Sequence, residues 1–361
     1  MTHNLLVNLS FLLSQPTGLA TYAGNLFPYL KSLEPTLLTA NKIDNFNCVP
    51  VPPNLTQAQG TKGNIQRLLW TEFQLPKLYH HLKTSLLFSP IPEAPIYSNC
   101  RFVVTVHDLI PLRFPRRFSA LTLYCRYYLP QVLAQAEHII CDSVATKKDL
   151  QTFFSLPDTK ITPVLLAYDK THFRPLPKDT QPSTIPYFFY IGRHDPYKNL
   201  HRLITAFAKL PNYQDYQLWI AGSSDPRFTP LLKTQTDELG LSEQIKFLDY
   251  LPYEQLPQIL NQALALVFPS LWEGFGLPVL EAMGCGTPVI TSNLSSLPEV
   301  AGDAALLVNP YKVEEITAAM EALATDAQLR SRLSQQSLHQ ASQFSWQKTA
   351  QETVEVLTRH W

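Results

Sequence analysis

Two carboxylates on either side of a glycine turn form the segment of this chain best suited to chemistry. Glu273 and Glu281 have seven residues between them, and the turn is Gly274-Phe275-Gly276. A strand of buried type, Leu264–Phe268, precedes the turn, and a short helix begins near Pro278, since proline suits the first helical position. Glycines allow a backbone to approach a ligand, and a helix N-terminus attracts anions. Both carboxylates are therefore expected to face one pocket and to accept hydrogen bonds from sugar or ribose hydroxyls.

A second element carries two cations beside a turn. The stretch YIGRHDPYKN places Arg193 and Lys198 shortly after a strand that ends at Ile191, with Gly192 allowing the turn. Arginine offers a planar fork of donors and lysine a point charge, and both bind phosphate oxygens well. This element is expected to neutralise a diphosphate, so that no metal ion is needed for that task.

The elements that must position these residues alternate between strands and helices, which is typical of an α/β protein. The expected strands are Asn4–Leu12, Thr36–Ala40, Ser85–Ser89, Phe102–Val106, His138–Cys141, Ile161–Leu166, Tyr187–Ile191, Gln217–Ala221, Ile245–Leu248, Leu264–Phe268 and Pro288–Ser292. The expected helices are Leu19–Leu33, Asn64–Leu82, Ala120–Ala136, Ala145–Phe154, Leu200–Leu210, Thr229–Leu239, Glu254–Gln262, Val279–Met283 and Val313–Ala324. Ligands of parallel sheets bind at the carboxyl ends of the strands, and the motifs described here all fall there.

Length and composition limit the class of protein. The chain of 361 residues suggests two domains, and its 45% of hydrophobic residues indicates a globular protein. Its 29 basic and 29 acidic residues balance, so nothing points to nucleic acid. The five cysteines have no metal-binding spacing, which favours a cytoplasmic protein. Neither a signal peptide nor a membrane span is expected from the sequence.

The motifs together resemble those of the retaining nucleotide-sugar glycosyltransferases of family 4. The segment EGFGLPVLEAMGCGTP matches the donor-site signature of that family without a gap, and Gly192 to Asn199 matches its G-R-x-x-x-x-K-N element. The resemblance implies a GT-B fold, in which two Rossmann-like domains face a cleft and the last helix returns to the first domain. The predicted division is 1–175 for acceptor binding, 176–344 for the nucleotide sugar, and 345–361 for the returning helix. The proline-rich segment Pro175–Pro186 is expected to be the linker.

The resemblance also assigns roles to individual residues. His107 and Glu273 are expected at the reaction centre, His107 through a hydrogen bond to a hydroxyl of the donor sugar. The expected donor-binding residues are Gly18, Arg193, Lys198, Leu251, Gly274, Phe275, Gly276, Leu277 and Glu281. Asp249 stands where the family usually has glycine, which leaves the local turn and the choice of base open. Neither a metal nor another cofactor is expected, because the nucleotide sugar is a substrate.

Some features allow more than one interpretation. Asp108 either assists His107 or orients a loop, and Gly18 is either a ligand contact or an ordinary turn residue. A basic aromatic cluster around Arg113, Arg116, Arg117 and Arg126 either binds an anionic acceptor or a membrane surface, or is a helix with buried aromatics and solvated arginines.

The expected activity is transfer of a hexose from a nucleoside-diphosphate sugar to a hydroxyl of a glycan, glycolipid or small sugar, with retention at the anomeric carbon. Alternatives are a sucrose-phosphate-synthase type of enzyme, a nucleotide-sugar epimerase on the same fold, and a sugar-binding protein without catalysis. The sequence predicts a cytoplasmic location and leaves open a peripheral contact with the inner face of a membrane. Donor sugar, base and acceptor are not determined by the sequence.

Overall fold

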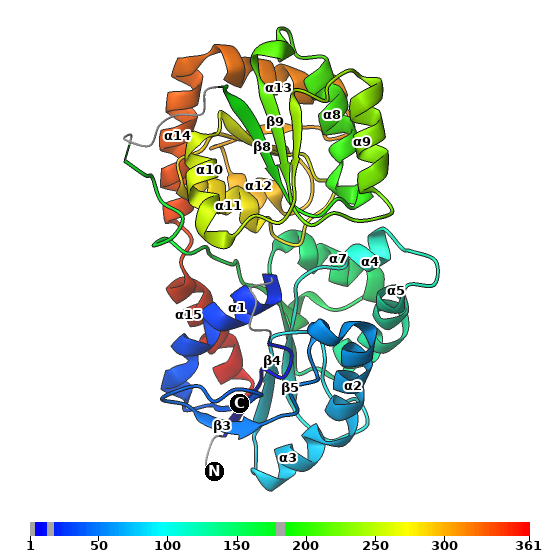
Figure 1. Cartoon of the computed structure of the whole chain (residues 1–361). Coiled ribbons are helices and arrows are strands. Elements are labelled where there is room, and N and C mark those ends of the chain that lie inside the picture. Colours follow the sequence, from blue (N-terminus) through cyan, green and yellow to red (C-terminus); the bar gives the residue numbers. More distant parts are fainter. Residues whose placement is uncertain (1–3, 13–17, 178–184) are drawn as a thin grey trace. The chain divides into compact units, whose positions relative to one another are not determined.

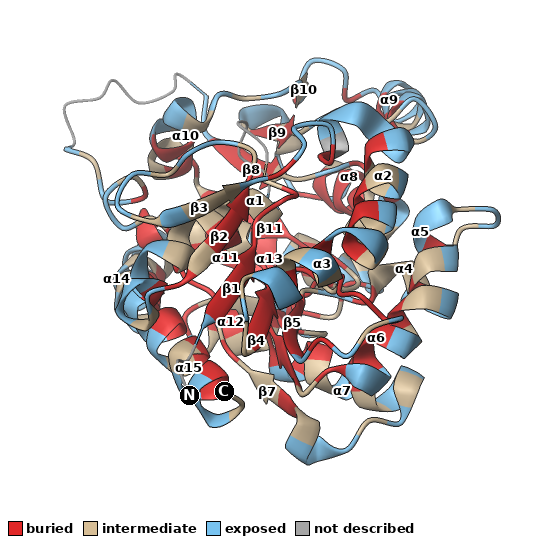
Figure 2. Cartoon of the chain, turned by 90° about the horizontal axis from the view of Figure 1, so that it is seen from below, coloured by how far each residue is buried: buried red, intermediate tan, exposed pale blue. Residues whose placement is uncertain are grey.

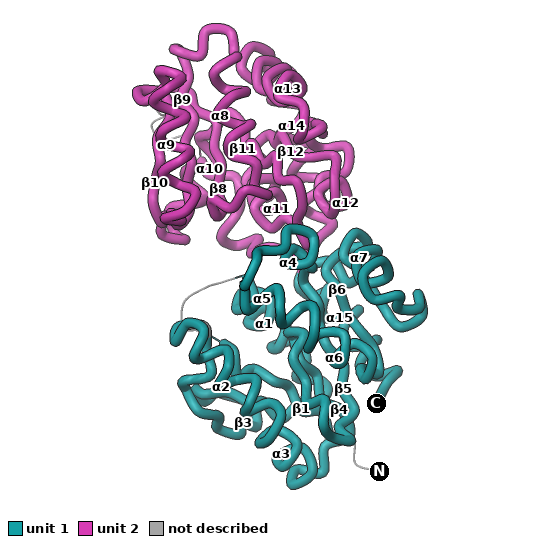
Figure 3. The backbone as a smooth tube through the Cα atoms, turned by 90° about the vertical axis from the view of Figure 1, so that its right-hand side faces the viewer, with its two compact units in different colours: residues 1–166, 346–361 teal, residues 167–345 magenta. Residues whose placement is uncertain are grey.

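The computed structural model describes residues 4–12, 18–177 and 185–361. The chain divides into two compact units, drawn in two colours in Figure 3. Unit 1 comprises Met1–Leu166 together with Trp346–Trp361, and unit 2 comprises Ala167–Ser345. The division after Leu166 falls earlier than the expected boundary at 175/176, because the residues from Ala167 onward belong to unit 2, where the His172 ring stacks on that of Tyr253 at 4.0 Å. The expected linker Pro175–Pro186 lies in large part outside the described residues.

Unit 1 is built on a parallel sheet of seven strands in the order β3-β2-β1-β4-β5-β6-β7. The strands are β1 Leu5–Asn8, β2 Thr36–Thr39, β3 Asn47–Pro50, β4 Leu86–Ser89, β5 Phe102–Val106, β6 His138–Cys141 and β7 Ile161–Pro163. Their side chains are mostly apolar and buried, as a sheet covered on both faces requires. Figure 2 shows β1, β4 and β5 as buried segments.

The helices of unit 1 are often divided by proline. The expected helix Leu19–Leu33 is an α-helix followed by a 3-10 turn that has Pro28 in its first turn, and Asn64–Leu82 is two helices, the second with Pro76 near its start. The helical elements are α1 Gly18–Leu26, η1 Phe27–Leu33, η2 Gln57–Gln59, α2 Gly60–Phe73, α3 Leu75–His81, α4 Ile110–Arg113, α5 Ala120–Leu123, η3 Tyr124–Tyr128, α6 Leu129–Gln135, α7 Val144–Phe154, η4 Asp158–Lys160 and α15 Trp346–Arg359.

Unit 2 has a parallel sheet of six strands in the order β10-β9-β8-β11-β12-β13. The strands are β8 Tyr187–Ile191, β9 Gln217–Ala221, β10 Ile245–Leu248, β11 Ala265–Phe268, β12 Val289–Ser292 and β13 Leu306–Val308. The helical elements are η5 Pro196–Lys198, α8 Leu200–Ala208, η6 Tyr213–Asp215, α9 Thr229–Glu238, η7 Tyr253–Gln255, α10 Leu256–Gln262, α11 Leu277–Gly284, α12 Leu297–Ala301, α13 Val313–Thr325 and α14 Ala327–Ser342. Figure 1 shows these helices around the strands.

The last helix, α15, belongs to unit 1. It packs on α1 and η1, the Trp346 ring lies 6.4 Å from that of Tyr22, and the Thr349 hydroxyl donates to the carbonyl of Leu165 at 2.7 Å. The predicted α/β architecture with two Rossmann-like sheets and a returning final helix is therefore confirmed. Two strands (β3 and β13) and three α-helices (α4, α12 and α14) were not predicted.

Candidate active site

In unit 2 the candidate residues gather where the strand order reverses. Strands β8 and β11 lie side by side at the centre of the sheet, and the chain continues to β9 and β10 on one side and to β12 and β13 on the other. The loops after β8 and β11 therefore leave the sheet in opposite directions, and a crevice for ligands forms at such a switch point. Arg193 and Lys198 follow β8, whereas Glu273 and Glu281 follow β11.

Lys198 and Glu273 form a buried ion pair. The Lys198 Nζ lies 2.6 Å from the Glu273 Oε1, and the two side chains are only 12% and 10% exposed. The ammonium group also lies 5.2 Å from the ring centre of Phe268 and 5.4 Å from that of Tyr197. The structure thus brings together a cation and a carboxylate that the sequence analysis treated as separate elements. An anion entering this site would meet an ammonium group that is already desolvated.

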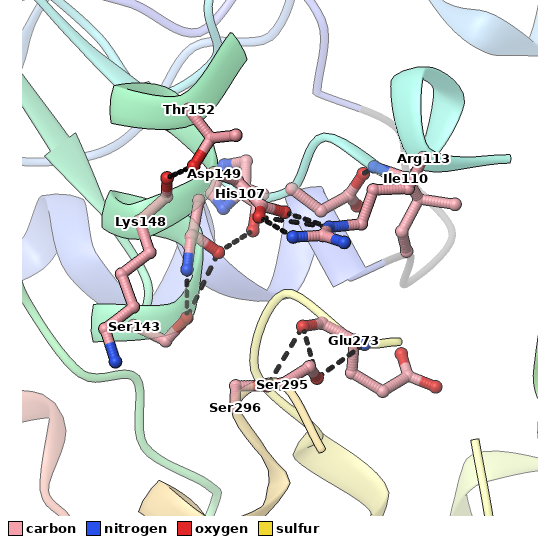
Figure 4. Close-up of polar contacts among 12 residues, drawn as sticks. His107, Ile110, Arg113, Ser143, Lys148, Asp149, Thr152, Glu273, Ser295 and Ser296 are labelled. Carbon is pink, nitrogen blue, oxygen red and sulfur yellow. Dashed lines mark hydrogen bonds and ion pairs between the residues drawn. The ribbon is translucent and has the colours of Figure 1, made fainter. Parts of the chain in front are cut away.

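Both loops that carry this pair are held by side chains that the sequence analysis did not assign. Asn199 is fully buried with φ +66°, and its amide donates to the carbonyls of Pro269 and Pro310 at 3.0 and 2.7 Å. The Ser295 and Ser296 hydroxyls donate to the Glu273 carbonyl at 3.1 and 3.0 Å (Figure 4). The Asn199 amide therefore ties the two loops together. Asn199 is the last residue of the G-R-x-x-x-x-K-N element, so its role could have been predicted from that motif.

Arg193 contrasts with Lys198 because it is open to solvent. Its Nε pairs with the Asp195 Oδ2 at 3.0 Å, but the side chain is 67% exposed, whereas Asp195 is 3% exposed. The carboxylate occupies one edge of the guanidinium fork. The exposed remainder of the group can bind phosphate oxygens without prior loss of a buried contact.

The glycine turn brings the backbone to the start of α11. Gly276 precedes the helix with φ +112°, a conformation that favours glycine, and a Cβ there would lie 2.8 Å from the Leu297 Cδ2. Phe275 is buried against Phe344, and its carbonyl accepts from the Ser296 hydroxyl at 2.8 Å. Gly274 lies in the turn and Leu277 is the first helical residue. The N–H groups of the first helical turn lack partners within the helix, so they suit an anion.

Glu281 lies inside α11, one turn beyond its start. Burial raises the pKa of its carboxyl to about 7. Tyr253 and Cys285 are close enough that the carboxylate in turn raises the pKa of both groups. Glu281 is therefore divided between its acid and carboxylate forms near neutral pH, and hydroxyl donors such as those of a ribose would favour the carboxylate.

The loop after β9 lies against the loop after β8. A Cβ on Gly222, which has φ +134°, would lie 2.0 Å from the Gly192 carbonyl oxygen, so the loops after β8 and β9 touch through their backbones. Gly222 N–H donates to the Asp249 carbonyl at 3.4 Å. The aspartate at position 249 thus keeps a backbone link to the neighbouring loop. Leu251 follows in the irregular segment after β10 and is half-buried.

In unit 1, His107 directly follows β5 and forms a second buried pair. Its Nδ1 lies 2.7 Å from the Asp142 Oδ2, and its Nε2 lies 2.8 Å from the Pro90 carbonyl oxygen. Burial lowers the pKa of His107, but Asp142 and the carbonyl outweigh it and raise that pKa above the ordinary value. Both ring nitrogens thus have partners inside unit 1. A hydrogen bond from His107 to a sugar hydroxyl requires that Nε2 release or share the Pro90 carbonyl.

Asp142 was missed from the sequence, although a signal for it exists. Val106 and Cys141 are register partners in the neighbouring strands β5 and β6, so His107 and Asp142 leave the same edge of the sheet together. Asp108, by contrast, accepts the Ile110 N–H at 3.0 Å and so contributes to its own loop. Gly18 is the first residue of α1, and a Cβ there would meet no atom of the described residues within 4 Å. Residues 13–17 of the preceding loop lie outside the described residues.

The basic aromatic cluster separates into two parts. Arg113 pairs with Asp149 on α7 (Figure 4), and the Tyr128 hydroxyl donates to Glu72 at 2.6 Å, so these side chains serve the fold. Phe118 and Tyr127 are 86% and 63% exposed, and Arg117 lies over the Phe118 ring at 5.2 Å. The exposed part remains available for binding a partner.

Two structural features bear on metals and membranes. Among residues 4–12, 18–177 and 185–361, no group of three or more His, Cys, Asp or Glu side chains is arranged to hold a metal ion. Within the same residues, no helix has both the length and the apolar character needed to cross a bilayer.

Comparison with protein families places the chain. The family described as glycosyl transferases group 1 matches residues 174–340, and glycosyltransferase family 4 matches residues 16–170. A relative from Escherichia coli, O-antigen chain mannosyltransferase B, is 33% identical over 265 residues, which cover 70% of this chain and 69% of the relative. The chain belongs to the family 4 glycosyltransferases. The prediction from the motifs is confirmed, and the protein is a glycosyltransferase that uses nucleotide sugars.

Solved structures support the fold. Sucrose-phosphate synthase from Thermosynechococcus elongatus has a TM-score of 0.77 at 18% identity, covering 99% of this chain and 98% of the other. Anabaena HepE in complex with UDP-glucose has a TM-score of 0.77 at 17% identity, covering 99% of each chain. At these identities the likeness concerns the GT-B fold alone.

Proposed function

We propose that this glycosyltransferase transfers a hexose, with mannose as the first candidate, from a nucleoside-diphosphate sugar to a glycan hydroxyl. The transfer retains the anomeric configuration and needs no divalent metal. The observation that carries the proposal is the Lys198–Glu273 pair, which lies with Arg193 at the switch point of the unit 2 sheet. The name of the mannosyltransferase relative supports the choice of mannose.

The donor site assigns a task to each residue. Arg193, Lys198 and the first N–H groups of α11 hold the diphosphate and stabilise the charge that develops on it as it leaves. The Glu281 carboxylate accepts hydrogen bonds from the ribose hydroxyls. Glu273, whose backbone carbonyl the two serine hydroxyls fix, directs its carboxylate toward the hexose. Leu251 and Gly274 to Leu277 line the same site through their backbone. In unit 1, Gly18 is also proposed as a donor-binding residue.

The proposed reaction proceeds on one face of the sugar. The acceptor oxygen attacks the anomeric carbon from the side on which the diphosphate departs, so the bond to phosphate oxygen breaks as the new glycosidic bond forms. The acceptor proton passes to the leaving phosphate oxygen. The protein then mainly provides position and charge stabilisation, and the cations Arg193 and Lys198 replace a metal ion. His107, held in place by Asp142, shapes the reaction centre.

The proposal extends to location. We place the enzyme in the cytoplasm, in peripheral contact with the inner membrane face through the exposed part of the basic aromatic cluster. Phe118, Leu121 and Tyr127 are more than half exposed, and Arg117 and Arg126 lie among them. Anionic lipid attracts such arginines, while aromatic and apolar side chains enter the headgroup region. Co-sedimentation with anionic but not with neutral vesicles is expected.

The experiment that tests the function has three steps. A thermal-shift screen of nucleotide sugars identifies the donor, because a bound donor raises the apparent melting temperature. Transfer to mannosides is then measured with and without a chelator, and the anomeric configuration of the product is read by NMR. Full activity in chelator and a retained configuration are expected. Activity that only a divalent metal restores, or an inverted product, would contradict the proposal. Donor incubated alone tests for epimerisation, and a small sugar phosphate as acceptor tests for the sucrose-phosphate-synthase type.

A further inference from the structure

Unit 1 contains a cavity that the donor chemistry does not use. It has a volume of about 450 Å³ and lies between α2 and α5, within the range of small-molecule sites. Most of its wall is apolar, with contributions from Leu19, Ile65, Leu68, Ile91, Leu121 and Tyr124. Ile65 and Leu121 are 53% and 58% exposed, so the apolar lining continues to the surface.

The cavity lies beside His107. The segment that follows β4 serves both, because the Pro90 carbonyl meets the His107 Nε2 while Ile91, Pro92 and Glu93 form part of the cavity wall. Helix α1 also serves both. Leu19 in its first turn lines the cavity, and one turn later the Tyr22 ring packs edge-on against His107 at 4.8 Å. A molecule in the cavity therefore lies next to the candidate reaction centre of unit 1.

The charged side chains in the wall satisfy each other. The Arg67 Nε and Nη2 each donate to a Glu93 oxygen at 2.7 Å, and the third nitrogen, Nη1, donates to the Leu55 carbonyl at 3.0 Å. Both side chains are nearly buried. The pair cancels in charge, so the wall does not suit a phosphate. Thr61, Asn64 and Ser119 also line the cavity, and the Asn64 Oδ1 is buried without a partner among the described residues, so the wall can accept a hydrogen bond. Because most of the wall is apolar, it suits an apolar group better than a sugar ring, whose several hydroxyls would lose hydrogen bonds without replacement.

We infer that the cavity holds the apolar aglycone of an amphipathic acceptor, so that the sugar hydroxyl to be glycosylated lies beside His107. The substrate class is a glycan or single sugar that carries an alkyl or isoprenoid chain, either free in solution or as a membrane lipid. This inference rests on the proposed glycosyl transfer for its role, but the binding of the chain can be measured separately.

The test uses n-alkyl α-mannopyranosides from methyl to octyl, each below the concentration at which it forms micelles. Calorimetry measures the dissociation constant of each mannoside with the full-length protein. Burial of each methylene is expected to tighten binding roughly fourfold until the cavity is filled. A dissociation constant that does not change from methyl to octyl overturns the inference.

Matched variants locate the binding. Ile65→Trp narrows the cavity from α2 and Ala120→Trp from α5, and both are expected to abolish the dependence on chain length. Leu69→Trp is the control, since Leu69 is on α2 with the same 53% exposure but is not part of the lining. The site is elsewhere if both cavity variants keep the wild-type dependence of affinity on chain length. The same conclusion follows if Leu69→Trp loses that dependence equally.

Two further measurements separate the outcomes. Thermal unfolding and nucleotide binding check that each variant is folded. Vesicles that display the same mannoside on a lipid anchor distinguish a membrane source from a soluble one, because a membrane lipid would be used at the vesicle surface. If chain-dependent binding is present but no donor is ever turned over, the proposed function fails and the aglycone site remains.

Discussion

Lys198–Glu273 in unit 2 and His107–Asp142 in unit 1 are buried acid–base pairs just beyond the carboxyl ends of parallel strands, and the two pairs differ in what they leave for a substrate. The Lys198 ammonium in unit 2 has one carboxylate and two aromatic rings around it, and its partner Glu273 has an exposed fraction of 10% in its side chain. The His107 ring in unit 1 has both nitrogens engaged by Asp142 and Pro90. An ammonium group can give up or share a carboxylate partner when a phosphate arrives, whereas a His107 ring with a partner at each nitrogen has neither nitrogen free for a substrate.

The comparison suggests a division of tasks. The Lys198–Glu273 pair of unit 2 has an ammonium group that can bind and release an anion, which suits a diphosphate. The pair in unit 1 holds an imidazole ring in place and lies beside an apolar cavity, which suits an acceptor that must be oriented. Four predictions test this contrast.

The largest effect is expected from Glu273→Gln, which removes the charge that we propose faces the hexose and keeps the shape. Turnover should fall about 100- to 1,000-fold, because charge develops on the sugar only in the transition state. Affinity for the free nucleoside diphosphate should not weaken, since Lys198 loses its competing carboxylate. Single-turnover kinetics and calorimetry measure the two quantities. Normal turnover combined with weak diphosphate binding would reverse the assignment.

Lys198→Ala should affect both stability and binding. It leaves the Glu273 carboxylate buried and unpaired, so the free energy of unfolding should fall by about 3 kcal/mol, and donor binding should weaken about 10- to 150-fold. Arg193→Ala is the matched comparison. Because Arg193 is 67% exposed, Arg193→Ala should lower the free energy of unfolding by about 1 kcal/mol or less. Its loss of donor affinity should be similar to that of Lys198→Ala. Chemical denaturation and calorimetry on both variants decide this. Equal stability of the two variants would show that the Lys198 pair is not a buried structural element.

Asp142→Asn tests the saturated pair of unit 1. The folded-state pKa of His107 is raised, so the stability that the pair contributes is complete below pH 6.5 and is lost as the pH rises through that folded pKa. The neutral ring has one N–H facing two acceptors. The variant should therefore cost about 1–3 kcal/mol at pH 6 and less at pH 9. Unfolding at the two pH values, with NMR titration of His107, measures both effects. A His107 pKa unchanged by the substitution would contradict the role given to Asp142.

The smallest effect is expected from the titration of Glu281. Its folded-state pKa of about 7 lies above the ordinary value, so the protonated form is favoured in the folded protein below pH 7. The carboxylate is the stronger acceptor for ribose hydroxyls, so affinity for the nucleotide sugar should rise about fivefold as the pH passes through 7. The nucleotide sugar is the right probe because its diphosphate does not titrate in this range. Glu281→Gln should remove the dependence, and a variant that keeps it would exclude Glu281 as its source.

Local sequence predicted the sheets better than it predicted the helices around them. Most strands are short, apolar runs, and their bounds agree within a few residues with the structure. Helix α14 was missed because AQLRSRLSQQSLHQAS is largely polar, so its small buried stripe of Leu333, Ser337 and Ala341 gives no clear periodicity. Strand β3 was missed because its side chains are partly exposed at the edge of the sheet.

The sequence by itself determined the family, the fold class and most of the charged residues of the site, with Asp142 as the exception. The sequence suffices for these features because the donor-site motifs are contiguous. Each motif encodes a turn, a helix start and a charged residue within a few positions. Only the tertiary structure decided which charge meets which partner. Lys198 and Glu273 are 75 residues apart and His107 and Asp142 are 35 residues apart, and each pair forms because parallel neighbouring strands release their loops at one edge. The apolar cavity arises in the same way, since α1, α2, α5 and the segment after β4 each supply one part of a wall that no single segment encodes.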